Sequence, residues 1–163
     1  MNKRHRFIYT AAAVLLVIFI TTGYWFSRHN LSFTCSSSTV SFYGNNGNNS
    51  NAASLNFTQT LNFNYLGKAT VFIAGELHTP EGVTYRMNRS VFYDYVHLGG
   101  SNYYLQVTDS ILAGNDDVPV SLAKTELAPL QQGASRIVGI RQLPSGDMVV
   151  ANNVGPFLIC AVH

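Results

Sequence analysis

Hydrophobic and polar residues follow two different patterns along this chain. From Phe7 to Phe26, twenty consecutive residues carry no charge. Beyond residue 30, hydrophobic and polar residues alternate over most of the sequence, beginning with Leu31, Phe33 and Cys35. An unbroken apolar run is typical of a helix that is apolar on all sides, whereas alternation is typical of strands with one buried face. The sequence therefore predicts one long N-terminal helix followed by a β-rich domain.

The uncharged run has the length and the flanks of a transmembrane helix. At about 1.5 Å per residue, twenty helical residues span roughly 30 Å, which matches the hydrocarbon core of a bilayer. Lys3, Arg4 and Arg6 precede the run, whereas Arg28 alone follows it closely. Basic residues accumulate on the cytoplasmic side of such helices. We therefore expect a cytoplasmic stub at residues 1–6, a transmembrane helix at 7–26 and an exported domain at 27–163.

A cleavable signal peptide is the alternative interpretation of this segment. Signal peptides also begin with basic residues, but their apolar stretch usually covers about 7–15 residues. The residues from Gly23 to Arg28 contain no small-x-small cleavage site. The sequence therefore favours an uncleaved single-pass anchor.

Seven or eight short strands are predicted in the exported segment. Turn-forming residues separate them, such as Gly67-Lys68 and Gly99-Gly100. The polar residues from Gly44 to Asn51 predict a flexible loop, and the residues near Ser121 to Leu127 leave room for a short helix. Short strands joined by hairpin-like turns predict an all-β domain, either a small antiparallel barrel or a sandwich. The predicted strands lie within residues 31–42, 55–65, 69–77, 83–96, 103–107, 136–143, 148–151 and 156–162.

Charge and cysteine content narrow the class of protein. Ten Lys and Arg residues stand against eight Asp and Glu residues, and three of the ten lie in the N-terminal stub. The exported segment therefore has a balance of −1 (seven minus eight), which does not suggest a nucleic-acid-binding surface. Cys35 and Cys160 lie near the two ends of this segment. In an oxidising compartment they are expected to form a disulfide, although two buried free thiols are the alternative.

Motifs of known catalytic chemistry are absent from the sequence. It contains no Gly-x-Ser-x-Gly, no His-Glu-x-x-His and no phosphate-binding glycine loop. His78 and His97 stand apart, and Asp116-Asp117 lacks the remaining ligands of a calcium loop. We interpret the two aspartates as solvated loop charges. The sequence predicts no enzymatic activity, no cofactor and no metal site.

Tyrosines and arginines in the centre of the chain are the most suggestive internal feature. Inward-facing tyrosines of a small barrel can line an apolar cavity that holds a lipid-like ligand. The alternative is ordinary cross-strand aromatic packing, with arginines that are solvated or form surface ion pairs. The candidate ligand or partner surface consists of Tyr85, Arg86, Arg89, Tyr93, Tyr95 and Tyr103.

The layout of the whole chain resembles a known family. A short basic stub, one anchor, the opening Leu31-x-Phe33-x-Cys35 and the ending Pro156 to Cys160 (Pro-Phe-Leu-Ile-Cys) resemble the FidL-like bitopic membrane proteins of enterobacteria. These are similar to the ToxS-type companions of membrane-anchored ToxR-type transcription regulators. The resemblance implies a periplasmic barrel, lipocalin-like in form, that pairs with a regulator and helps it sense a ligand such as a bile acid. No ligand-contacting residue carries over.

These observations together predict a function without catalysis. The expected protein is a single-pass accessory protein of the bacterial inner membrane whose periplasmic domain pairs with and modulates a membrane-anchored regulator. The alternative is a membrane-tethered periplasmic protein that binds lipids or other amphiphiles alone, as a carrier or chaperone.

Overall fold

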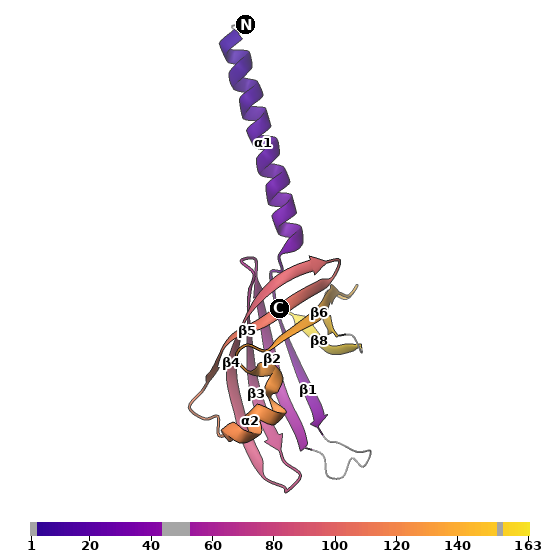
Figure 1. Cartoon of the computed structure of the whole chain (residues 1–163). Helices are drawn as coiled ribbons and strands as arrows, with labels where there is room; N and C mark the ends of the chain where they lie inside the picture. Colours follow the sequence, from indigo (N-terminus) through magenta and orange to yellow (C-terminus); the bar gives the residue numbers. More distant parts are fainter. Residues whose placement is uncertain (1–2, 44–52, 153–154) are drawn as a thin grey trace.

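A long helix leads into a β-barrel in the computed structural model of the chain (Figure 1). The structure describes residues 3–43, 53–152 and 155–163. Helix α1 spans Lys3–His29 and projects from one end of the barrel (Figure 1). The predicted loop from Gly44 to Asn51 lies outside the described residues. No helix within the described residues has both the length and the apolar character needed to cross a membrane.

The predicted all-β domain is confirmed, and of its two expected architectures the structure has the antiparallel barrel. In the described residues eight strands pair in sequence order and close on themselves, with β8 beside β1. Every pairing is antiparallel, and each strand pairs with the next one along the chain. The connection between β5 and β6 is a longer segment. The strands are β1 (Phe33–Tyr43), β2 (Ala53–Asn64), β3 (Lys68–His78), β4 (Thr84–Gly99), β5 (Asn102–Leu112), β6 (Ser135–Gln142), β7 (Met148–Ala151) and β8 (Pro156–Val162).

The alternation seen in the sequence is the alternation between the inside and the outside of the barrel. Along β4, Met87, Arg89, Val91, Tyr93 and Tyr95 are buried, and the residues between them are less buried. Successive strand residues point to opposite faces, which gives this period of two. Barrel closure then turns one face of every strand into a shared core.

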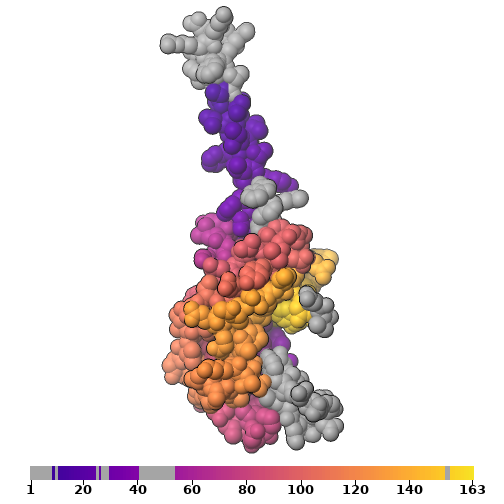
Figure 2. Space-filling model, in the orientation of Figure 1, coloured from indigo at the N-terminus to yellow at the C-terminus, as the bar shows by residue number. Residues whose placement is uncertain are grey.

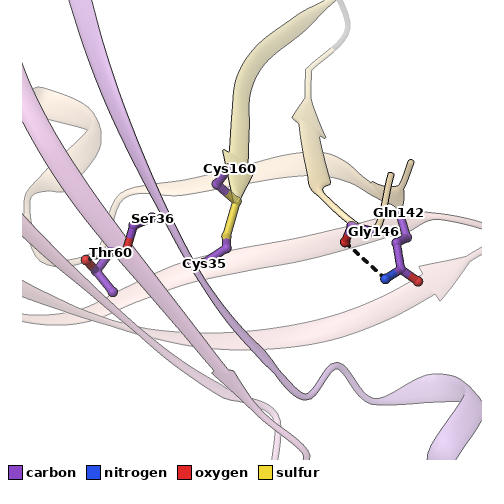
Figure 3. Close-up of a disulfide and its surroundings, with 6 residues drawn as sticks. All are labelled: Cys35, Ser36, Thr60, Gln142, Gly146 and Cys160. Carbon is purple, nitrogen blue, oxygen red and sulfur yellow. Dashed lines mark hydrogen bonds between the residues drawn. A yellow bond between two sulfur atoms is a disulfide. The ribbon is translucent and has the colours of Figure 1, made fainter. Parts of the chain in front are cut away.

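The barrel is fully closed at the end next to α1. There β8 pairs with β1 at Cys35↔Val162 and Ser36↔Ala161, and the disulfide Cys35–Cys160 links the same two strands (Figure 3). Both cysteines are completely buried. The predicted bridge between the first and last strands is therefore confirmed. We call this half of the barrel the closed end.

The other half of the barrel is built differently. Strands β1 to β5 extend well beyond the short strands β6 to β8, and the chain between β5 and β6 fills the space that this leaves. This chain includes α2 (Val120–Glu126) and the 3₁₀ helix η2 (Ala128–Leu130), which lie against the barrel (Figures 1 and 2). Helix α2 confirms the short helix predicted near Ser121 to Leu127. Leu127 and Ala123 are buried in the common core. We call this half the far end.

Hydrogen bonds fix the base of α1 to the barrel. Three residues, Asn30 to Ser32, connect α1 to β1. The hydroxyl of Tyr95 accepts a hydrogen bond from the Leu31 N–H at 2.9 Å and lies 3.1 Å from the Leu31 carbonyl and 2.6 Å from the Asn64 carbonyl. The ring of Tyr95 also packs edge-on against Phe63 and Tyr103. This aromatic cluster therefore seals the closed end and holds the connection to α1.

Candidate functional site

The interior of the barrel contains an apolar cavity of about 210 Å³. Its walls come from inward-facing aliphatic and aromatic residues of β2 to β8 and from Leu127 and Leu130 of the α2–η2 segment. Five residues of its lining carry polar side chains: Thr39, Gln59, Tyr93, Glu126 and Arg136. Small-molecule sites typically combine apolar walls with a few polar groups, although drug-sized ligands usually occupy about 300–1,000 Å³. The cavity thus suits a short alkyl chain or one end of a larger apolar molecule.

The cavity opens where β1 and β8 diverge. Beyond Ser36, no described residue pairs with β1 on the side away from β2, so residues 37–43 leave an unpaired strand edge. We call the space between this edge and β8 the β1–β8 gap. Partly exposed lining residues surround it, namely Thr39 on β1, Glu126 and Leu130 on the α2–η2 segment, and Phe157 on β8. The lining of the cavity therefore reaches the exposed surface at the side of the barrel.

The direction of the backbone groups along this edge follows from one hydrogen bond. The His163 N–H donates to the Thr34 carbonyl at 3.2 Å, so the backbone groups of Thr34 face β8. These groups alternate sides along a strand, which turns those of Ser36, Ser38 and Val40 the same way. The hydroxyl contacts of Ser36 with Thr60 and Ser38 with Thr58, both 3.1 Å, fit this assignment because side chains approach closely in non-hydrogen-bonded pairs. The N–H and C=O groups of Ser38 and Val40 thus face the gap.

Arg136 and Tyr93 form the main polar contact in the cavity. Nη2 of Arg136 donates to the Tyr93 hydroxyl at 3.1 Å and to the Pro129 carbonyl at 3.0 Å. No described residue accepts a hydrogen bond from the other guanidinium nitrogens. Burial raises the pKa of the Tyr93 hydroxyl, and the positive charge and hydrogen bond of Arg136 oppose that rise. The site therefore keeps a neutral phenol beside a cation with donors to spare, which suits a carboxylate, sulfate or hydroxyl group.

Arg89 does not line this cavity, although it belongs to the predicted ligand or partner surface. It is 3% exposed and forms a buried ion pair with Asp116, through Nε at 2.7 Å and Nη2 at 3.0 Å. The Asp116 carboxylate also accepts hydrogen bonds from the N–H groups of Asn88 and Val118. The interpretation of Asp116 as a solvated loop charge is therefore wrong. The pair ties the segment before α2 to β4.

The other predicted site residues separate into three groups. Tyr93 faces the cavity, as the ligand-binding interpretation requires. Tyr95 and Tyr103 are buried in the aromatic cluster of the closed end, as the packing interpretation predicts. Tyr85 is partly buried against the core, and Arg86 is exposed with its N–H bonded to Asp117. The structure thus brings one of the six candidate residues to the cavity.

Several residues that line the cavity were missed in the sequence. Arg136 lies at the start of β6, far along the chain from the tyrosine-rich strands, and Glu126 and Leu127 lie in the segment that breaks the alternation. Arg136 shares the inward face of β6 with Val138 and Ile140, and this period of two was the available signal. Glu126 had no such signal because its position depends on where α2 packs.

Comparisons with known proteins add no identification. The chain matches no family model, no curated protein and no solved structure. Among the described residues, no group of three or more His, Cys, Asp or Glu side chains is placed to hold a metal ion.

Proposed function

We propose that this protein is a single-pass accessory protein of the bacterial inner membrane whose periplasmic barrel binds a small amphiphile and modulates a membrane-anchored regulator. The observation that carries the proposal is the apolar cavity, with the Arg136–Tyr93 contact in its wall and the β1–β8 gap at its side. The apolar part of the ligand occupies the cavity, and its anionic or hydroxylated end pairs with Arg136. A bile-acid-like molecule or a lipid has this chemistry.

The anchor is supported by the sequence and by the exposure of α1. The structure does not describe four side chains of the run from Phe7 to Phe26, namely those of Phe7, Ile8, Thr10 and Trp25. Each described large apolar side chain from Val14 to Ile20 is more than half exposed. Apolar surfaces of this extent are normally covered by lipid or by a partner. We assign the stub at residues 1–6 to the cytoplasm and residues 27–163 to the periplasm, as the flanking charges predict.

The unpaired edge of β1 supports pairing with a partner. Exposed strand edges accept an additional strand from another chain, and the backbone groups of Ser38 and Val40 are available for this. An anchor confines both proteins to two dimensions and so raises their effective concentration. Because the edge borders the cavity, a bound ligand contacts the region where the partner would add its strand. The ligand shifts association only if it binds one association state better than the other.

Ligand binding is tested with the full chain in lipid nanodiscs and a dansyl-labelled fatty acid. We expect saturable fluorescence enhancement that Arg136→Gln weakens and that Val150→Phe abolishes by filling the cavity. Phe72→Ala is the matched control because Phe72 is 51% exposed on the outside of β3. Equal binding by all four proteins would show that the probe sits elsewhere and would contradict the cavity assignment.

Partner pairing is tested with two adjacent proline substitutions. Ser38→Pro removes an N–H that faces the gap, and proline is tolerated in such edge positions. Ser37→Pro removes an N–H that faces β2 and is the control for damage to the barrel itself. If the edge joins a regulator, Ser38→Pro abolishes co-purification of a ToxR-type membrane protein while the barrel stays folded. Unchanged co-purification with Ser38→Pro would rule out the edge.

A stand-alone amphiphile-binding protein is the second candidate, and the cavity favours it equally. In that case the dansyl fatty acid binds as described, and mild crosslinking in native membranes captures no regulator. The two experiments together therefore distinguish the candidates.

A further inference from the structure

Four exposed apolar side chains lie at the end of the barrel from which α1 projects. Tyr65 and Leu66 form the turn between β2 and β3, and Val96 and Leu98 lie near the end of β4. Their exposed fractions lie between 54% and 66%. The two segments are neighbours, because the Tyr95 N–H donates to the Gly67 carbonyl at 2.8 Å. We call these four residues the apolar rim.

The apolar rim is held close to the base of α1. The three residues from Asn30 to Ser32 can span at most about 10 Å, and Tyr95 fixes the middle one by hydrogen bonds. The rings of Phe26, the last residue of the uncharged run, and Tyr65 lie 6.5 Å apart, edge to face. The end of the uncharged run and the rim are therefore in direct contact.

We propose that the apolar rim inserts into the headgroup region of the bilayer that holds α1. This inference rests on the anchor of the proposed function. The headgroup region is roughly 5–7 Å deep on each side, and the three helical residues after Phe26 advance about 4.5 Å. The rim therefore reaches the interface without any change in the barrel. Tyrosine favours this interface, and leucine and valine gain from leaving water.

The charges beside the rim are compatible with this position. Lys68 and Asp94, which border it on β3 and β4, pair with each other at 2.6 Å. Paired charges oppose lipid contact less than isolated ones. Contact through the rim directs the closed end toward the membrane and the far end toward the aqueous space. The lateral β1–β8 gap then stays accessible to ligands and partners that approach above the bilayer.

The test uses the full chain in vesicles of phosphatidylethanolamine and phosphatidylglycerol. Leu66→Cys and Leu98→Cys are labelled separately with an environment-sensitive nitrobenzoxadiazole group, with Val83→Cys as the matched control. Val83 is 45% exposed and lies in the connection between β3 and β4, at the opposite end of the barrel. We expect blue-shifted emission at 66 and 98 and strong quenching there by lipids carrying a nitroxide on the headgroup. The label at 83 should show neither effect.

Vesicle flotation separates this inference from the anchor. If the labelled chains float with the vesicles but positions 66, 98 and 83 are equally unquenched, the rim does not touch lipid and this inference fails alone. If the chains do not float, the anchor fails and the rim contact with it. If the emission at 66 and 98 is blue-shifted in vesicles and in detergent but the nitroxide lipids of the vesicles do not quench it, a protein contact covers the rim. That result also overturns the inference. Circular dichroism of each variant in detergent verifies that the barrel is folded.

Discussion

The closed end and the far end of this barrel are stabilised by different means. At the closed end, eight strands, a disulfide and an aromatic cluster complete the barrel. At the far end, the α2–η2 segment takes the place of strands, and the buried Arg89–Asp116 pair secures it. The far end therefore leaves an unpaired strand edge beside the cavity, which the closed end lacks among the described residues. The comparison therefore places the candidate binding surface in the half of the barrel that strand pairing leaves incomplete.

The largest effect is expected from breaking the ion pair of the far end. Arg89→Met leaves the Asp116 carboxylate buried without its partner, and loss of one member of a buried pair costs about 3–5 kcal/mol. The double variant Arg89→Met, Asp116→Leu should recover part of this loss, because it leaves no buried charge, although the N–H groups of Asn88 and Val118 lose their acceptor. Denaturant titration of the oxidised chain gives the free energy of unfolding of the single variant and of the double variant. A double variant as unstable as the single one would contradict the assigned role of the pair.

Removal of the disulfide tests the closed end. Cys35 and Cys160 are 125 residues apart, so the double variant to serine loses a long-range constraint on the unfolded chain. Loss of such a bridge typically costs about 2–5 kcal/mol. Hydrogen exchange should rise first in β8 and in the start of β1, while the far end changes less. Ser36→Ala is the control, because it removes only a partly buried hydroxyl contact with Thr60 on the neighbouring strand β2. Equal exchange in both halves would refute the division.

A smaller effect is expected from the tyrosine that joins α1 to the barrel. Tyr95→Phe keeps the aromatic packing but removes the hydroxyl that contacts Leu31 and Asn64. Buried polar groups left without a partner cost about 1–3 kcal/mol. Tyr104→Phe is the control on the neighbouring strand. Protease cleavage between α1 and β1 should become faster in Tyr95→Phe alone, and an unchanged rate would argue that the hydroxyl does not hold this connection.

Alkaline pH should give the smallest effect. Burial raises the pKa values of Tyr93, Tyr95 and Tyr103 above the ordinary value of 10.0. Their contribution to stability is therefore complete below pH 10 and is lost as the pH rises through the higher values of the folded state. Unfolding titrations at pH 8 and pH 11 measure the loss, which Tyr103→Phe should reduce. If Tyr103→Phe loses as much stability between pH 8 and pH 11 as the unsubstituted protein does, Tyr103 does not contribute to the loss.

Much of the barrel was predictable because local rules governed it. Period-two alternation placed Met87, Val91 and Tyr93 on one face, and turn residues such as Gly67 separated the strands. The pairing of Cys35 with Cys160 followed from their number and their positions near the ends of the segment. Strand order and the length of each pairing were not predictable, because they depend on contacts between residues distant in sequence.

The candidate site was predictable only in part. Tyr93 was a candidate for the cavity wall, but Arg89 was assigned to the surface until its partner was known. Asp116 lies 27 residues from Arg89, and no local pattern links them. Similarly, Arg136 reaches Tyr93 from a strand that pairs with β5 rather than with β4. Polar contacts of this kind depend on three-dimensional proximity rather than on periodicity.

The sequence by itself determined the uncharged N-terminal run and the all-β character of the remainder, because each depends on composition or on spacing along the chain, and it favoured the disulfide. The tertiary structure decided which tyrosine faces a cavity, which arginine is buried and where the barrel opens. These features depend on the unequal lengths of the paired strands and on the position of α2. Long-range packing therefore created the site, whereas local patterns specified the fold that contains it.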